Sequence, residues 1–349
     1  DRFMMEEQFG WRVEKFCPSA MRILNTEDLH SLREARQLAV KKGYEFNLSN
    51  PTHIAQYLHS DLAIREVAAI FRSDLTLMIS PVEVELLIEH FQVSKQQLMY
   101  LPFMLPALSE THTKALPSFD ERAHFISIGN FRHAPNWDIV LQLKQYIWPL
   151  IRKQLPQAEL HIYGAYPPPK ATQLHNPKQG FLIKGWAEDA QEVIQSARVL
   201  LAPIRFGAGI KGKLSDAMSC GTPSITTSIG SEGMLPEISP SSDWPGEVVL
   251  LDQQKDGGDN TSFYTRFADA AVKAYQDIDT YEALQKKGFE LLNQQYDKIY
   301  WQAQFIERLN SQLEQLIQLR QSNFFSLMLR HHSMKSTQYM AQWIEAKNS

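Results

Sequence analysis

Glycines and lysines are concentrated between residues 202 and 224 in a pattern that could bind an anion. The residues concerned are Gly207, Gly209, Lys211, Gly212 and Lys213. Glycines let a backbone approach a ligand closely, and the first N–H groups of a helix present about half a positive charge to an anion. The two lysines add full charges, so the pattern indicates a diphosphate site. The alternative is a glycine-rich turn with two solvated lysines.

The elements around this stretch predict a doubly wound parallel sheet. Six apolar runs of strand length alternate with helical patterns. The runs are residues 125–129, 159–164, 181–185, 199–204, 224–227 and 248–251. Helices are expected at 136–154 and 213–220, with Asn136 as the N-cap of the first. The glycines and lysines therefore follow the fourth strand, at the edge where open α/β sheets bind ligands.

The first third of the sequence predicts a smaller sheet. Strands are expected at residues 21–25, 75–79 and 98–103, and helices at 31–42 and 81–91. Ser80, Pro81 and Glu83 have the spacing of a capping box with proline at the first helical position. Residues 105–123 are rich in Pro, Ser and Thr, which is typical of a linker between domains.

The sequence from Thr265 onward is helical in pattern. Apolar side chains recur at close to a 3.5-residue period at Phe305, Leu309, Leu313 and Leu316. This stripe predicts a packed amphipathic helix, and a coiled-coil dimer is the alternative.

Composition excludes several classes of protein. The 349 residues hold 35 Lys and Arg against 39 Asp and Glu, a net charge of −4, so nucleic acid is not an expected partner. The hydrophobic fraction of 44% fits a globular chain of two domains. Two cysteines, Cys17 and Cys220, argue against a disulfide framework. They also favour a reducing compartment, so we expect a cytoplasmic location. No apolar run approaches the ~20 residues of a membrane span.

Several motifs in order resemble the nucleotide-sugar half of glycosyltransferase family 4, the group 1 glycosyl transferases. They lie at residues 128–136, 185–189, 202–224 and 228–233, and the resemblance is good from 125 to about 235. Residues 135 and 136 are Pro-Asn where most members have Lys-Gly, which is similar to one subgroup of the family.

This resemblance implies an α/β fold of the GT-B type, in which two Rossmann-like domains face a cleft. The expected parts are a partial acceptor-side domain with linker (1–118), a nucleotide-sugar-binding domain (119–300) and a helical C-terminal extension (301–349). Since residues 1–118 offer three strands against six in the second half, we expect an N-terminal domain that is incomplete and a truncated chain that is weakly active or inactive alone.

The resemblance also implies an activity. A nucleoside-diphosphate sugar would give its sugar to a glycan, a lipid-linked acceptor or a protein, with retention of anomeric configuration. No metal and no other cofactor is expected; positive groups and helix amides would stabilise the departing diphosphate. A lipid-linked acceptor would bring peripheral membrane contact, although no strong basic amphipathic helix is present.

Site residues follow from the same resemblance. The expected donor-binding residues are Gly129, Asn130, Gly185, Trp186, Arg205, Gly207, Gly209, Ile210, Lys211, Lys213 and Asp216. Asp216 stands where members commonly carry the second of two glutamates and would bind the ribose. Ala208 replaces the first glutamate, which leaves the sugar open. Arg205 either adds a third positive charge or is simply exposed.

Asp28 and His30 are the catalytic candidates of the first half, together with Lys211 in the second. Asp28 and His30 follow the strand at 21–25, and the segment 28–30 resembles an Asp-Leu-His segment of the subgroup. Either side chain could face the donor sugar or the acceptor hydroxyl as an acid, a base or a hydrogen-bonding group. Alternatively, Asp28 or Ser31 simply caps the next helix.

Two other functions are compatible with these residues. One is a GT-B nucleotide-sugar epimerase, which would require carboxylates beside the sugar. The other is a degenerate, non-catalytic module that binds a nucleotide or glycan, with Ala208 marking the lost catalysis.

Overall fold

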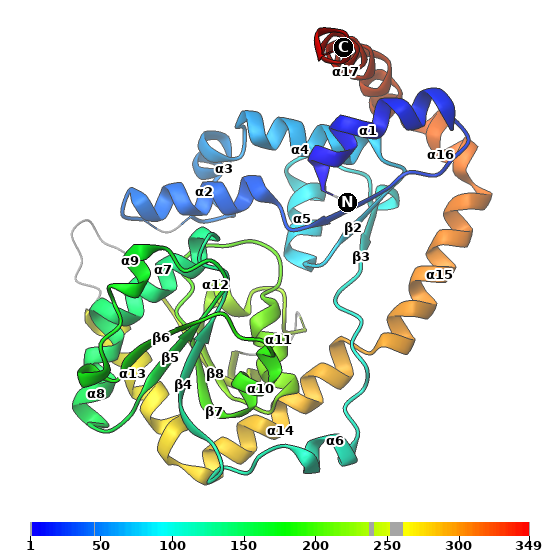
Figure 1. Ribbon diagram of the computed structural model, residues 1–349. Coiled ribbons are helices and arrows are strands. Elements are labelled where there is room, and N and C mark those ends of the chain that lie inside the picture. The colour runs from blue at the N-terminus through cyan, green and yellow to red at the C-terminus, as the bar shows by residue number, and fades with distance from the viewer. Residues whose placement is uncertain (1, 45, 237–240, 252–260, 349) are drawn as a thin grey trace. The chain divides into compact units, whose positions relative to one another are not determined.

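The computed structural model describes residues 2–44, 46–236, 241–251 and 261–348 (Figure 1). The chain divides into two compact units. The first comprises Asp1–Ala35, Phe46–Met104 and Lys298–Ser349, and the second comprises Arg36–Glu45 and Leu105–Asp297. Residues 301–349, expected as a separate extension, thus group with the first unit.

The second unit is built on a parallel sheet of six strands in the order β6-β5-β4-β7-β8-β9. The strands are β4 (Ala123–Ile128), β5 (Leu160–Tyr163), β6 (Phe181–Gly185), β7 (Ala197–Ala202), β8 (Ser224–Thr227) and β9 (Gly246–Val249). β7 and β8 are almost wholly buried, as expected for strands covered on both faces. All six predicted strands are confirmed, with ends shifted by one or two residues.

Helices cover both faces of this sheet (Figure 1). They are α6 (Glu110–Ala115), α7 (Ala134–Gln142), α8 (Trp148–Gln154), α9 (Pro169–Thr172), α10 (Ala190–Gln195), α11 (Gly212–Ser219), α12 (Ser228–Ser231), α13 (Thr261–Gln276) and α14 (Ile278–Gln295). α13 packs on α8 and on β7, β8 and β9, whereas α11 packs on α10, α14 and β8.

The single helix predicted at 136–154 is wrong in detail. α7 is followed by a π-helical turn, Leu143–Ile147, before α8 begins. Pro149 lies in the first turn of α8 and has no N–H to donate, and its ring excludes the carbonyl of the preceding turn. The backbone widens there, as at π-bulges generally. The predicted linker at 105–123 also contains a helix, α6.

The first unit contains a parallel sheet of three strands in the order β1-β2-β3. Its elements are β1 (Ile23–Glu27), β2 (Leu75–Met78), β3 (Leu98–Tyr100), α1 (Phe3–Phe16), α3 (Pro51–Tyr57), α4 (Asp61–Arg72), α5 (Pro81–Glu89), α15 (Lys298–Glu314), α16 (Leu316–Ser322) and α17 (Phe324–Asn348), and α2 (His30–Lys41) begins here. α1, α4 and α17 pack against one another. The three predicted strands are confirmed.

The capping box predicted for α5 is wrong in its hydrogen bonds. Ser80 and Pro81 hold the N-cap and the first helical position as expected, but Ser80 gives the helix no side-chain hydrogen bond. Glu83 is buried, and its Oε1 accepts a hydrogen bond from the N–H of Leu29 at 3.0 Å. A tertiary contact has therefore replaced the local one.

The apolar stripe predicted for the tail is also wrong at one position. Leu313 is 54% exposed, whereas the neighbouring Gln312 is only 2% exposed. The inward face of α15 therefore carries a buried amide where the periodicity placed leucine.

Both cysteines are free, Cys17 exposed and Cys220 buried. Burial raises the pKa of the Cys220 thiol to about 11. None of the helices in the described ranges has the length and apolar character to cross a bilayer.

Candidate functional site

The candidate donor site lies at the carboxyl edge of the six-stranded sheet, where the direction of strand addition reverses. β4 pairs with β5 on one side and with β7 on the other, although two strands separate β4 from β7 in the sequence. The turns after β4 and β7 therefore leave neighbouring strand ends in opposite directions. Ligands of open α/β sheets bind at such a switch point.

One side-chain amide connects the two turns. Lys213 Nζ donates to Asn136 Oδ1 at 2.6 Å, and Asn136 Nδ2 donates to the carbonyl of Asn130 at 3.1 Å. The prediction that Asn136 caps its helix is wrong, because His133 occupies the N-cap position of α7. Burial lowers the pKa of Lys213 to about 8. The lysine is thus poised to gain stability from a nearby anion.

Tight packing explains why residue 129, in the turn after β4, and residue 164, after β5, are both glycine. A Cβ on Gly129 would lie 2.6 Å from the side chain of Asn136. A Cβ on Gly164, which follows β5, would lie 2.1 Å from the carbonyl of Gly129. Only glycine leaves room for the amide that holds Lys213.

The second turn, between β7 and α11, offers backbone N–H groups and lysine charges to a ligand. Gly209 has a φ of 61°, in the left-handed region that favours glycine, and the neighbouring Ile210 is buried. Lys211 donates from Nζ to the carbonyl of Gly209 at 2.7 Å and occupies the N-cap position of α11. A lysine has no acceptor to cap a helix with, so its side chain leaves the partial positive charge of the α11 amides for an anion.

Glu232 is a functional candidate that sequence reasoning did not single out. Arg36, which groups with this unit, donates from Nη1 and Nη2 to its two carboxylate oxygens at 2.7 Å each. Arg36 Nη1 also donates to the carbonyl of Gly207 at 2.8 Å. Burial acts to raise the pKa of Glu232, but Arg36 and Lys211 lower it overall. The sequence did offer one indication of this residue, because Glu232 lies within the motif at 228–233.

Arg205 is paired. Its guanidinium donates two hydrogen bonds to the carboxylate of Asp138, at 2.9 and 2.5 Å. Asp138 thereby balances the charge of Arg205, an ion pair that neither sequence alternative included.

The other expected donor residues lie apart from Lys213 or at the surface. Gly185 ends β6, two strands away from β4 in the sheet, with a φ of 76° and open space around it. Trp186, which follows it, is 69% exposed. Asp216 lies exposed on α11. A nucleotide that reached Trp186 from Lys213 would extend along the same edge of the sheet.

Asp28 and His30 lie together in the first unit, after β1. His30 Nε2 is 3.6 Å from Asp28 Oδ1, and Asp28 also forms an ion pair with Arg33. Burial lowers the pKa of His30, Arg33 lowers it further, and Asp28 partly opposes both. The lowered pKa favours the neutral imidazole, which can accept a proton at one nitrogen and donate from the other.

The cap of α2 comes from elsewhere in the fold. Glu66 accepts hydrogen bonds from the N–H groups of His30 and Ser31, at 2.9 and 3.1 Å, and from the Ser31 hydroxyl at 2.7 Å. The alternative in which Asp28 or Ser31 caps this helix is thus replaced by a buried carboxylate of α4. The backbone that carries His30 is firmly held.

Within the described ranges, no group of three or more His, Cys, Asp or Glu side chains is arranged to hold a metal ion.

Residues 122–249 match the sequence model of a family described as glycosyl transferases group 1. This match covers the sheet from the start of β4 to the end of β9, and with it both turns of the candidate site. Among curated protein sequences there is no significant match.

Solved structures share the fold at low identity. Sucrose-phosphate synthase from Thermosynechococcus elongatus is 17% identical with a TM-score of 0.58, covering 89% of this chain and 72% of that one. HepE from Anabaena, solved with UDP and glucose, is 11% identical with a TM-score of 0.57, covering 88% and 76%. TarM from S. aureus, solved with Fondaparinux, alpha-GlcNAc-glycerol and UDP, is 11% identical with a TM-score of 0.55 and 72% of this chain covered.

These likenesses define the class of fold. The chain has the α/β GT-B fold of glycosyltransferases, with a helical C-terminal region, and this prediction is confirmed. The chain spans about half the length of TarM and of the pneumococcal O-GlcNAc transferase GtfA, covering 47% and 48% of them. The narrower Pro-Asn subgroup remains a prediction.

Proposed function

We propose that the protein is a metal-independent, retaining glycosyltransferase that transfers a sugar from a nucleoside-diphosphate sugar to a glycan, lipid-linked or protein acceptor. The observation that carries this proposal is the position of Lys213 and Lys211 at the start of α11, beside the switch point of the sheet. The match over residues 122–249 supports it. HepE, TarM and GtfA were each solved with UDP, which favours a uridine nucleotide as the donor.

In this proposal the diphosphate lies against the first amides of α11. Lys213 would exchange its hydrogen bond to Asn136 for one to a phosphate oxygen, and Lys211 would add its charge from the turn. As the bond between the sugar and the diphosphate breaks, negative charge grows on the leaving oxygen. Positive groups already fixed in place stabilise that charge without reorganising, which is the largest electrostatic contribution available to such a site.

Asp28 and His30 are the proposed catalytic residues of the first unit. A neutral His30 could accept the proton of the acceptor hydroxyl, and Asp28 would then stabilise the imidazolium. Their spacing of 3.6 Å allows this with a small movement of either side chain.

Thermal unfolding with UDP, GDP, ADP, CMP or buffer tests the donor site. A ligand at about 100 times its dissociation constant adds roughly 2.7 kcal/mol to the native state. One diphosphate is expected to raise the unfolding midpoint, and the double variant Lys211→Ala, Lys213→Ala to lose that shift. Lys286→Ala is the matched control, because Lys286 is 79% exposed and lies on α14. If the nucleotide still raised the unfolding midpoint of the double variant, these lysines would not be part of the nucleotide site.

The activity itself is tested with the corresponding sugar nucleotides and EDTA. Release of the nucleoside diphosphate that depends on an acceptor, and an unchanged anomeric configuration in the product by NMR, are the expected results. An isomerised sugar nucleotide would instead indicate an epimerase. Binding without any release would indicate the non-catalytic module.

A further inference from the structure

The first unit contains a cavity of about 480 Å³, within the range of small-molecule sites, lined by both polar and aromatic side chains. It lies at the amino ends of the strands, because Asp74 directly precedes β2 and Gln97 directly precedes β3, and both line it. Asp28 and His30 follow the carboxyl end of β1, at the opposite edge of the same parallel sheet. The cavity is therefore separate from the proposed catalytic residues.

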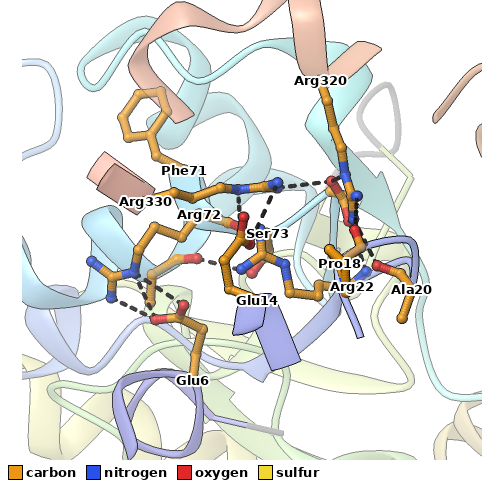
Figure 2. Close-up of polar contacts among 12 residues, drawn as sticks. Glu6, Glu14, Pro18, Ala20, Arg22, Phe71, Arg72, Ser73, Arg320 and Arg330 are labelled. Carbon is orange, nitrogen blue, oxygen red and sulfur yellow. Dashed lines mark hydrogen bonds and ion pairs between the residues drawn. The ribbon is translucent and has the colours of Figure 1, made fainter. Parts of the chain in front are cut away.

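One wall of the cavity is formed by Asp74, Arg320 and Arg330, which belong to a larger cluster of charged side chains (Figure 2). Arg320 donates to both carboxylate oxygens of Asp74, at 2.8 and 2.7 Å, and Arg330 donates to Asp74 Oδ1 at 2.8 Å. A third arginine, Arg22, donates its backbone N–H to Asp74 Oδ2 at 2.8 Å. Glu14 is the second carboxylate of the cluster, 3.0 Å from Arg22 Nη2. Three guanidinium groups thus face two carboxylates, which leaves an excess positive charge.

The pKa values show how strongly this excess acts. Burial would raise the pKa of Asp74, but the hydrogen bonds from Arg320, Arg22 and Arg330 lower it to about 2. Burial and the charge of Arg330 lower the pKa of Arg22 to about 10. Arg22 Nη1 is buried and donates no hydrogen bond among the described residues, whereas Nη2 forms an ion pair with Glu14. An anion beside Arg330 would relieve this repulsion.

Two buried side-chain amides on the cavity wall each have an oxygen atom that accepts no hydrogen bond among the described residues. Gln97 Nε2 donates to the carbonyls of Phe71 and Ser73, at 3.3 and 3.1 Å, and Gln312 Nε2 donates to the carbonyl of Gln96 at 2.6 Å. These bonds fix the orientation of both amides. Their Oε1 atoms are buried without a hydrogen bond among the described residues, and the side chains are 7% and 2% exposed. A buried carbonyl oxygen without a hydrogen-bond donor is destabilising, so these oxygens favour a ligand whose hydroxyl groups can donate to them.

Aromatic rings complete the lining. Phe71 and Phe325 have ring centroids 6.1 Å apart, and Phe324 lines the same cavity. Phe324 and Phe325 are 73% and 63% exposed, which is unusual for phenylalanine. Exposed rings beside amides and hydroxyl groups present an apolar surface to the C–H face of a sugar and polar groups to its hydroxyls.

We propose that this cavity binds a saccharide that carries a negative charge, such as a uronic acid unit of a glycan. Arg330 would hold the anionic group, Gln97 and Gln312 would accept hydrogen bonds from sugar hydroxyl groups, and Phe325 would pack on the ring. Arg330 lines the cavity, and its Nη1 atom has only a long ion-pair contact with Glu14, at 4.0 Å. This site would act independently of the donor nucleotide.

Titration calorimetry and saturation-transfer NMR on the full chain test the proposal. The probes are tri-galacturonate, a hyaluronan tetrasaccharide and fully methyl-esterified tri-galacturonate, the last having the same sugars without the charge. At least one anionic probe is expected to bind, and the ester at least tenfold more weakly than its acid. Phe325→Ala is expected to weaken binding at least fivefold, whereas Phe16→Ala, an equally exposed ring outside the cavity, leaves it unchanged.

Arg330→Gln addresses the charge directly. It is expected to abolish the preference for the acid over the ester, with circular dichroism confirming that the variant folds. If Arg330→Gln fails to fold, Phe325→Ala still tests the cavity. Absence of binding by both anionic probes, or binding that is indifferent to Phe325, would overturn the proposal. UDP binding measured on the same samples separates this result from a failure of the donor site.

Discussion

Lys213 Nζ lies 2.6 Å from Asn136 Oδ1, and this hydrogen bond joins the helix after β7 to the helix after β4. The two residues are 77 positions apart in the sequence. They meet because β4 and β7 are adjacent in the sheet and both turns leave its carboxyl edge. The lysine is held at the edge where we propose that a diphosphate lies, with an amide as its only partner among the described residues.

The affinity for a nucleoside diphosphate is expected to fall as the pH rises through 8. Lys213 has a pKa of about 8 in the free protein, and a bound phosphate favours its charged form, so binding takes up a proton above that pH. Each pH unit above 8 should then weaken binding by up to about tenfold. Titration calorimetry of UDP at pH 7, 8 and 9 measures this.

The control for this prediction is Lys213→Arg, which stays charged throughout the range. Its affinity should be nearly independent of pH. A wild-type affinity that does not change between pH 7 and 9 would mean that Lys213 does not bind the diphosphate.

Gly129→Ala is expected to weaken nucleotide binding and to destabilise the fold by about 1–3 kcal/mol. The new methyl group would lie 2.6 Å from the Asn136 side chain, so the amide must rotate away and release Lys213. Urea unfolding and the nucleotide-induced shift in midpoint measure the two effects. Gly288→Ala serves as the control, since its Cβ would be 3.4 Å or more from its neighbours.

Asn136→Ala combined with Gly129→Ala separates the causes. If the clash is what matters, the double variant regains stability relative to Gly129→Ala alone, but nucleotide binding stays weak because Lys213 has lost its partner. Equal stability of the single and double variants would show that the glycine is needed for backbone conformation.

The local pattern of apolar residues was enough to predict the strands and the edge of the sheet at which the candidate donor site lies. Short apolar runs separated by helical patterns predicted the strands of both described sheets, and burial on both faces explains such runs most directly at β7 and β8. The turns at Gly129 and Gly209 followed from their positions after two of these strands. The prediction that Lys211 and Lys213 lie at the start of a helix agrees with α11.

The side-chain pairs that sequence reasoning missed depend on partners distant in the chain. Arg205 is neutralised by Asp138, 67 residues away, and Glu83 is drawn from its own helix to the N–H of Leu29, 54 residues away. No spacing rule reports such pairs. The buried Gln312 was missed for a related reason, since periodicity favoured the apolar Leu313 and could not register a polar cavity at the amino end of the sheet.

Acid is expected to destabilise the second unit through a pair of stacked histidines. The His124 and His161 rings lie 3.8 Å apart at 18°, and burial, together with the charge of His161, lowers the pKa of His124 to about 4. Below about pH 6.5 the unfolded chain binds a proton that the folded chain excludes, so stability falls as the pH drops from 6.5 toward 4. Urea unfolding at pH 7, 5.5 and 4.5 measures the loss.

His124→Gln should flatten this pH dependence, because glutamine does not titrate. The exposed His90→Gln is the control and should leave the slope as in the wild type. An unchanged slope in His124→Gln would place the acid sensitivity elsewhere.

Glu66→Ala is expected to lower the free energy of unfolding by about 2–3 kcal/mol and to reduce any transferase activity. The variant leaves three donors at the start of α2 without their acceptor: the N–H groups of His30 and Ser31 and the Ser31 hydroxyl. Glu66→Gln keeps one carbonyl oxygen and should lose less, and Glu85→Ala, on the exposed face of α5, should lose little. Because Glu66 holds the backbone of His30 rather than its ring, Glu66→Ala should lower kcat while the donor nucleotide binds as before. A variant that binds UDP more weakly in proportion to its lost activity would contradict this positioning role.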